Sequence, residues 1–288
     1  SFRDSSSISS SIELAIATLS IEKNWKICGW NIETLSLIYK SVFISFLDHL
    51  EELRMNVSLV SFIQDANNSM GDDNKLDICK EYINTYINTY IKTNAISTIS
   101  LTTFGEDQPN SNNFGDDDYC DVNEVVKMEN NIISKVQDKV NSVKVGSAIC
   151  DDKKNYERHE RPADLIGSMA VVYNSQLQKS TEKSTENTSI VYIPHIIILT
   201  DAENRFENDE NDENDDHKDL QRILTSFMNM GTHIHFIVVG KGNQYTKIKE
   251  VNIKLFKDIA DLTEGACTVT LVDLNNNQSV KEALKDLT

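Results

Sequence analysis

One carboxylate in the sequence stands where open α/β sheets commonly bind their ligands. The apolar residues Ile196 to Leu199 predict a buried strand, and Asp201 follows that strand by two positions. A carboxylate there has the chemistry of a ligand to Mg²⁺, which prefers several hard oxygen atoms. Asp201 and Ser20 alone would hold a divalent ion poorly, because tight sites recruit more oxygens than these two provide. The pattern therefore favours a loop hydrogen-bonding role for Asp201.

Other reactive residue types in the chain lack the spacing that their chemistry needs. His233 and His235 lie two apart on a predicted strand, but no carboxylate or cysteine cluster supports a zinc site around them. Gly240 to Gly242 is too short for a phosphate-binding loop, and no nucleotide-binding fingerprint follows the first predicted strand. No Gly-x-Ser-x-Gly elbow is present. We therefore expect no enzymatic activity and no cofactor in this chain.

Composition narrows the class of protein further. The 288 residues are 39% hydrophobic and 25% charged, as expected for a globular chain, and we predict a single domain over residues 1–288. The net charge of −17 disfavours direct binding to nucleic acid. The five cysteines form no Cys-x-x-Cys pair, which favours a reducing compartment. We also expect no membrane association, because no apolar run reaches about 18 residues.

Hydrophobic periodicity predicts alternating strands and helices. The predicted strands are Glu13–Ile21, Val57–Ile63, Ile190–Thr200, His233–Val239 and Ala266–Val272. The predicted helices are Glu33–Leu50, Asn123–Val140, Ala163–Leu177, Lys218–Met230, Ile253–Thr263 and Ser279–Leu287. Strands that are apolar on both faces predict an α/β fold with a doubly wound, mostly parallel sheet flanked by helices. Ligand contacts are expected just after Leu19, Ile63, Leu199 and Val239.

Two segments interrupt this alternation. Residues 64–121 are predicted to form a low-complexity insertion, in which Leu76–Lys92 shows a Tyr/Ile pattern and Ala95–Thr103 has the β-branched composition of a strand. Glu203–Asp216 is a run of acidic residues and asparagine. Like charges in a block repel one another, so this run predicts a solvated loop.

Three segments of the second half carry a resemblance to a known family. In order along the chain they are IIILTDAE, HIHFIVVGKG and LFKDIADLTEGACTVTLVD, with a predicted helix between the first two. This order resembles the second half of a von Willebrand A domain over roughly residues 163 to 287. The resemblance implies a Rossmann-like sheet of the kind that the periodicity also predicts.

The family's metal-ion-dependent adhesion site has an Asp-x-Ser-x-Ser loop after its first strand, a threonine in a middle loop, and an aspartate after a later strand. With Glu13–Ile21 as the first strand, the loop motif falls on residues 18–22 and lacks its leading carboxylate. The resemblance therefore implies a degenerate site near Thr18, Ser20, Glu22 and Asp201, and no metal is expected there.

The order of segments along nearly the whole chain resembles one intracellular group of this family, the thirty-four-kilodalton von Willebrand A subunits of general transcription factor TFIIH. The resemblance includes Trp25, a helix start with Leu165, Gly167 and Ser168, and a Thr-x-Gly strand entry at Thr263 and Gly265. It implies a nuclear, non-enzymatic scaffold subunit of the TFIIH core. That core serves transcription initiation and nucleotide excision repair, and the implied partners are its other subunits, especially the second von Willebrand A subunit. The group's cysteine-rich zinc module is absent from these 288 residues.

Two alternatives stay open at this point. In the first, the chain is a metal-dependent adhesion or ligand-binding domain in which the Asp4–Ser7 loop meets Asp201 and Mg²⁺ binds between them. In the second, it is a von Willebrand A subunit of another intracellular assembly, such as the proteasome or the Ku heterodimer. The interface residues and the oligomeric state do not follow from the sequence.

Overall fold

The structure, a computed structural model of the whole chain, describes residues 40–41, 55–91, 97–106, 122–129, 133–146, 165–181, 190–203, 216–241, 246–263 and 265–275. The chain divides into two compact units, residues 1–55 with 184–191 and residues 56–183 with 192–288. The strands described below lie in the second unit, except for Met55, Ile190 and Val191 at the start of two of them. No helix among these residues is both long and apolar enough to cross a membrane.

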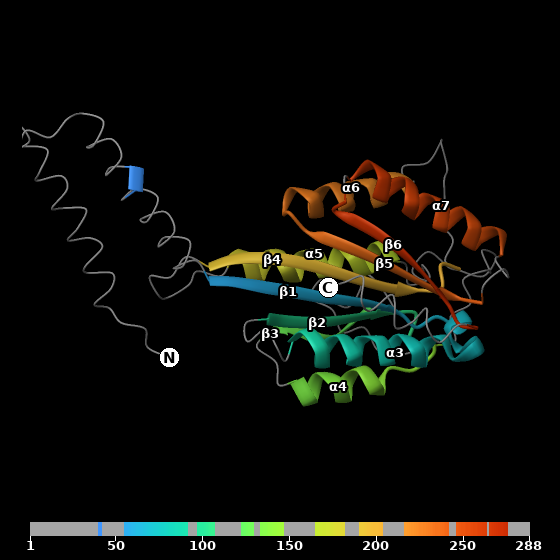
Figure 1. Cartoon of the computed structure of the whole chain (residues 1–288). Helices are drawn as coiled ribbons and strands as arrows, with labels where there is room; N and C mark the ends of the chain where they lie inside the picture. The colour runs from blue at the N-terminus through green and yellow to red at the C-terminus, as the bar shows by residue number, and fades with distance from the viewer. Residues whose placement is uncertain are drawn as a thin grey trace, which may run out of the picture. The chain divides into compact units, whose positions relative to one another are not determined.

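A six-stranded sheet forms the centre of the second unit (Figure 1). Its strands are β1 (Met55–Asp65), β2 (Ser97–Phe104), β3 (Val122–Glu129), β4 (Ile190–Thr200), β5 (His233–Gly240) and β6 (Cys267–Asp273). They lie in the order β3-β2-β1-β4-β5-β6. The pairs β1·β2, β4·β5 and β5·β6 are parallel, whereas β2·β3 is antiparallel. The centre of the sheet is therefore β1 beside β4.

Helices cover both faces of this sheet. One buried cluster joins the sheet to the 3₁₀ helix η1 (Asn68–Asn74), α3 (Lys75–Tyr86), the π-helical turn η2 (Ile87–Ile91) and α4 (Ile133–Ser142). The other joins it to α5 (Leu165–Thr181), α6 (Asp216–Asn229) and α7 (Lys247–Leu262). The predicted α/β class, with a mostly parallel sheet between two layers of helices, is confirmed.

Most elements of the second half lie where periodicity places them. The strand predicted over Ile190–Thr200 is β4 with the same bounds, and those at His233 and Ala266 are β5 and β6 within one residue. The helix predicted from Ala163 is α5, and that from Lys218 is α6. Helix α7 begins at Lys247, six residues before the predicted start, because Thr246 caps it by accepting the Lys249 backbone N–H at 3.1 Å.

The helix predicted over Asn123–Val140 is wrong. Residues 122–129 form β3, and only the later part of the segment is helical, in α4. Val126 and Met128 are buried while Lys127 and Glu129 are exposed, which is the period of two residues expected for a strand with one buried face. Residues 122–129 pair with β2, and this pairing satisfies the backbone N–H and C=O groups that a helix would satisfy internally. The neighbouring strand therefore makes the segment a strand.

Parts of the predicted insertion at 64–121 belong to the fold itself. The Tyr/Ile-patterned stretch forms α3 and η2, and the β-branched stretch forms β2, which lies beside β1. The predicted strand Val57–Ile63 lies within β1 at the centre of the sheet. Some predicted elements lie outside the described residues, namely Glu13–Ile21 and Ser279–Leu287. The same is true of Glu33–Leu50, apart from the helical Lys40 and Ser41, and of positions 204–215 in the acidic run.

Candidate functional site

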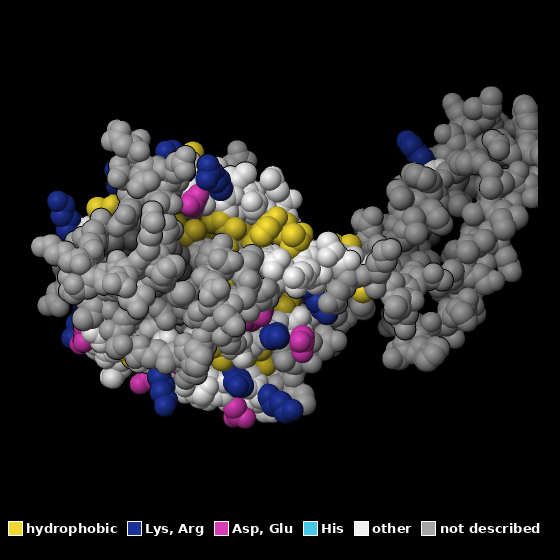
Figure 2. Space-filling view, turned by 180° about the vertical axis from the view of Figure 1, so that it is seen from behind, with side chains coloured by type: hydrophobic (Ala, Val, Ile, Leu, Met, Phe, Trp, Pro, Cys, Tyr) yellow, Lys and Arg dark blue, Asp and Glu magenta, His cyan; other side chains and the backbone are white. Residues whose placement is uncertain are grey.

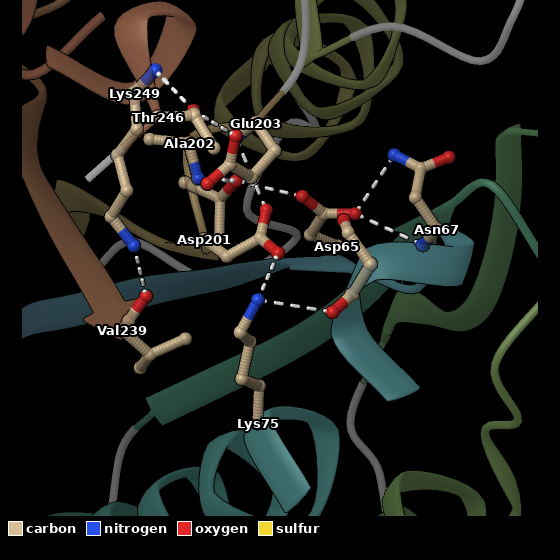
Figure 3. A network of polar contacts seen from close by, with 11 residues as sticks. Asp65, Asn67, Lys75, Asp201, Ala202, Glu203, Val239, Thr246 and Lys249 are labelled. Carbon is tan, nitrogen blue, oxygen red and sulfur yellow. Dashed lines mark hydrogen bonds and ion pairs between the residues drawn. The ribbon is translucent and has the colours of Figure 1, made fainter. Parts of the chain in front are cut away.

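The carboxyl ends of the two central strands bring two aspartates together (Figure 3). Asp65 is the last residue of β1, Thr200 is the last residue of β4, and Asp201 follows directly after it. Thr200 Oγ1 donates a hydrogen bond to Asp65 Oδ2 at 2.7 Å. Asp65 Oδ1 accepts from the backbone N of Asn67 at 3.0 Å and from its Nδ2 at 2.9 Å. Both oxygens of the buried Asp65 carboxylate therefore accept hydrogen bonds from within the protein.

Lys75 supplies a positive charge to this edge from the first position of α3. Its Nζ donates to Asp201 Oδ2 at 2.8 Å and to the backbone oxygen of Ser69 at 3.1 Å. The side chain of Asp201 is 0% exposed and that of Lys75 is 12% exposed, so the ion pair is shielded from water. Asp73 and Asn74 have φ values of 57° and 59°, and this left-handed turn before α3 leads the chain into the helix that carries Lys75.

Hydrogen bonds from β4 and from α7 stabilise the loop after β4. Ala202 has a φ of 62°, an uncommon conformation for a residue with a Cβ atom. Its backbone N donates to Thr200 Oγ1 at 3.0 Å, and the backbone N of Glu203 donates to Asp201 Oδ1 at 3.1 Å. Asn252 on α7 donates from Nδ2 to the Ala202 oxygen at 2.9 Å. These contacts fix the direction in which Asp201 points.

A second lysine lies near Asp201, on the side of α7. Lys249 is 3% exposed, and its Nζ donates to the backbone oxygen of Val239 at 2.7 Å. Burial lowers the pKa of Lys249; the carboxylates of Asp201 and Glu203 act in the opposite direction, and the charge of Lys75 adds to the lowering. Thr246 donates its hydroxyl to Glu203. Three carboxylates and two lysines thus share this edge of the sheet.

A further layer supports Asp65 and Asn67 from β2. Gly105 has a φ of 80°, and a Cβ atom there would lie 2.0 Å from Asn67 Oδ1. The backbone N of Ala66 donates to the Phe104 oxygen at 2.9 Å, and the N of Gly146 donates to the Ala66 oxygen at 2.8 Å. The position of Asn67 therefore depends on a glycine at the end of the neighbouring strand.

The residues at this edge include oxygens that suit a divalent cation, in the spacing Asp65-x-Asn67-x-Ser69, with Asp201 beside them. Their arrangement does not fit one, however. The Lys75 ammonium already contacts Asp201 Oδ2 and the Ser69 oxygen, and it would repel a second cation at close range. Among the described residues, no group of three His, Cys, Asp or Glu side chains is arranged to hold a metal ion.

The predicted degenerate site is only partly within the described residues. Thr18, Ser20 and Glu22 lie outside them, so their role stays a prediction, and the same holds for the Asp4–Ser7 loop. Asp201 is buried at the end of β4, with the loop hydrogen bond expected of it and an ion pair that was not expected.

The sequence interpretation missed the partners of Asp201, which come from the β1 loop and α3. Asp65, Asn67 and Lys75 lie in the segment that was assigned to an insertion. The sequence signal is Asp-x-Asn-x-Ser, which begins two residues after the apolar run Val57–Ile63. Ligand contacts are expected just after Ile63, but with Glu13–Ile21 as the first strand the family's loop motif falls on residues 18–22 instead.

The histidines form a separate group on β4 and β5. The rings of His195 and His233 stack with centroids 5.2 Å apart, and His195 and His235 stack at 6.4 Å. His235 Nδ1 lies 2.7 Å from Thr268 Oγ1 on β6. Burial and the neighbouring imidazoles of His195 and His233 lower the pKa of His235 to about 4.

No protein-family profile matches the sequence. A search of curated proteins also gives no match. Solved structures that are similar include two structures of proximal thread matrix protein 1 from the mussel byssus. They are 9% and 11% identical to this chain, with TM-scores of 0.47 and 0.42. The alignments cover 81% and 82% of this chain and 47% and 46% of the mussel protein, so the chain spans about half of that protein's length. The strand order and mostly parallel sheet of this chain are compatible with a von Willebrand A-like fold.

Proposed function

We propose that this chain is a non-enzymatic scaffold that binds other proteins through a von Willebrand A-like domain. The observation that carries this proposal is the ion pair between Lys75 and Asp201, which fills the edge of the sheet where related folds bind a ligand. This buried carboxylate is poorly placed for general acid or base catalysis, because both of its oxygens already accept hydrogen bonds and burial keeps a substrate from reaching it. The carboxyl edge of the sheet then stabilises the domain, and the outer surface binds the partner proteins.

Exposed apolar side chains on α7 suit such a surface. Val251 is 53% exposed and Leu262 is 80% exposed. Eleven residues make about three helical turns, so the two side chains lie on one side of α7, about 16 Å apart along it. On the face that Figure 2 presents, hydrophobic side chains also form a band beside Lys, Arg, Asp and Glu side chains. Interfaces combine an apolar centre with a charged rim of this kind.

The finer proposal is that this scaffold is a nuclear subunit of the TFIIH core and pairs with the second von Willebrand A subunit. It rests on the order of segments along the chain and on the resemblance that this order carries. The proposal includes no cofactor, no direct contact with nucleic acid and no membrane association. A von Willebrand A subunit of another intracellular assembly would share the scaffold role and differ only in its partners.

One observation favours a second candidate, a metal-dependent adhesion or ligand-binding domain. The spacing Asp65-x-Asn67-x-Ser69 beside Asp201 provides the oxygen chemistry that Mg²⁺ prefers. For a metal to bind there, Lys75 would have to leave Asp201 and Ser69. Partner binding would then require divalent ions, which makes the two candidates separable.

Affinity purification of the full tagged chain from its native cells, with and without EDTA, tests these proposals. Recovery of TFIIH subunits regardless of EDTA supports the scaffold and its assembly. Recovery of a different intracellular complex regardless of EDTA supports the scaffold alone, whereas an EDTA-sensitive ligand contradicts it. Leu262→Ser should reduce recovery if α7 forms the interface. Leu177→Ser on α5 is the matched control, since that leucine is 37% exposed.

A further inference from the structure

The Lys75 ammonium lies between Asp201 and the loop after β1, where a divalent cation would otherwise join the two segments. Its ammonium contacts one charged oxygen, Asp201 Oδ2, and one neutral oxygen, the Ser69 carbonyl. It thus connects the end of β4 to the loop after β1, as a shared cation would. An ammonium group has no lone pair, so it can take the place of a metal ion but cannot help to bind one.

The remaining contacts at this edge are complete without a second cation. Asp65 accepts hydrogen bonds from Thr200 and Asn67, which are neutral donors. The second oxygen of Asp201 accepts the Glu203 backbone N–H. Each of the two buried carboxylates therefore has a donor on both of its oxygens, as buried carboxylates require.

We propose that Lys75 is a built-in replacement for a divalent cation at the Asp65–Asp201 edge. The chain thereby keeps this edge ordered in the absence of metal ions, and the positive charge of Lys75 keeps them out. Removing that charge frees Asp201 Oδ2 and the Ser69 carbonyl oxygen, which lie at the same edge as the Asp65 carboxylate, and turns the edge into a divalent-cation site. This inference concerns metal dependence and holds for any protein partner.

Mn²⁺ binding to the full chain, measured by electron paramagnetic resonance, tests this proposal. The wild type should bind no Mn²⁺ at this edge below about 1 mM, and EDTA should leave its melting temperature unchanged. Lys75→Met should gain one Mn²⁺ site at least about tenfold tighter than any in the wild type. Adding Asp201→Asn to that variant should abolish the gained site, which separates it from diffuse binding to an acidic surface.

Lys80→Met is the matched control, because Lys80 lies on the same helix and pairs at 3.5 Å with the exposed Asp77. It should behave as the wild type does. Lys75→Gln provides a second variant that removes the charge but retains an amide donor, in case Lys75→Met does not fold. Tight Mn²⁺ binding by the wild type that Asp201→Asn removes would overturn the proposal, and so would a folded charge-removing variant that gains no site.

Discussion

Thr200 donates its hydroxyl hydrogen to Asp65 Oδ2 at 2.7 Å, across 135 positions of the sequence. Both groups are buried, and the bond joins the ends of the two central strands of the sheet. The same hydroxyl oxygen accepts the Ala202 backbone N–H at 3.0 Å. One threonine therefore links the β1 carboxylate to the strained loop that positions Asp201.

Thr200→Val removes this hydroxyl with little change in shape. We expect the free energy of unfolding to fall by about 2 to 3 kcal/mol, because a buried carboxylate loses a donor and a backbone N–H loses its acceptor. Urea denaturation followed by circular dichroism measures the change. Thr225→Val on the exposed side of α6 is the control and should alter stability by less than about 0.5 kcal/mol. Equal effects of the two substitutions would show that the Thr200 contacts add nothing.

Lys75→Met leaves the buried Asp201 carboxylate without its ion-pair partner. We expect a loss of about 3 kcal/mol in the free energy of unfolding, the usual cost of breaking a shielded pair from one side. Lys80→Met should cost less than about 0.5 kcal/mol, because the Lys80–Asp77 pair is exposed at Asp77. Lys75→Met combined with Asp201→Asn should recover part of the loss, since the uncompensated charge is then gone. The prediction is wrong if the two single lysine variants are equally stable.

Gly105→Ala tests the support of the site from β2. The added Cβ would lie 2.0 Å from Asn67 Oδ1 and 2.9 Å from the Asn67 backbone N, at a φ of 80°. Asn67 would have to move and lose its bonds to Asp65, and we expect a destabilisation of about 3 kcal/mol or more. Gly231→Ala is the matched control, with a φ of 70° and no atom within 4 Å of the added Cβ.

Gly231→Ala should cost only about 1 kcal/mol, the backbone term alone. Chemical denaturation of the two variants side by side measures the difference. A similar cost for both substitutions would mean that Asn67 adjusts freely.

The stacked histidines predict a loss of stability in mild acid. His235 has a pKa of about 4 in the folded chain against 6.5 ordinarily, so the unfolded chain binds a proton more readily. The stabilising contribution is therefore complete above pH 6.5 and is lost as the pH falls from about 6.5 to about 4. Because one pKa unit corresponds to about 1.4 kcal/mol, we expect about 3 kcal/mol from this group over that range. Burial and His233 lower the pKa of His195 as well, with the same sign.

Melting curves between pH 7 and pH 4 for the wild type and His235→Gln measure this effect. The variant should lose less stability over the acidic range, because glutamine does not take up a proton there. The difference between the two curves separates His235 from the many carboxylates of the chain. Parallel curves would contradict a role for His235 in acid sensitivity.

Local hydrophobic periodicity was sufficient to predict the strands and helices in the second half of the chain. The apolar runs at Ile190 and His233 can be buried only as strands with helices on both faces, and α5 and α6 show the spacing of helices packed on a sheet. These patterns repeat over a few residues and need no knowledge of distant segments. The class of fold and the position of Asp201 at a strand end followed from them.

Residues 122–129 show where local pattern failed. The sequence VNEVVKME is compatible with a helix, but β2 offers an unpaired edge and makes the segment a strand. The choice between the two depends on a partner strand that lies elsewhere in the chain, and no local pattern encodes it.

The sequence by itself determined an α/β chain with a carboxylate at the end of a buried strand. Only the tertiary structure decided what that carboxylate contacts, because Lys75 lies 126 positions from Asp201 and reaches it only when β1 and β4 pair. Residue spacing records neighbours along the chain, whereas the charge balance of a buried site depends on groups that folding brings together. The difference between a metal site and an internal ion pair therefore lies in the packing of α3 against the sheet.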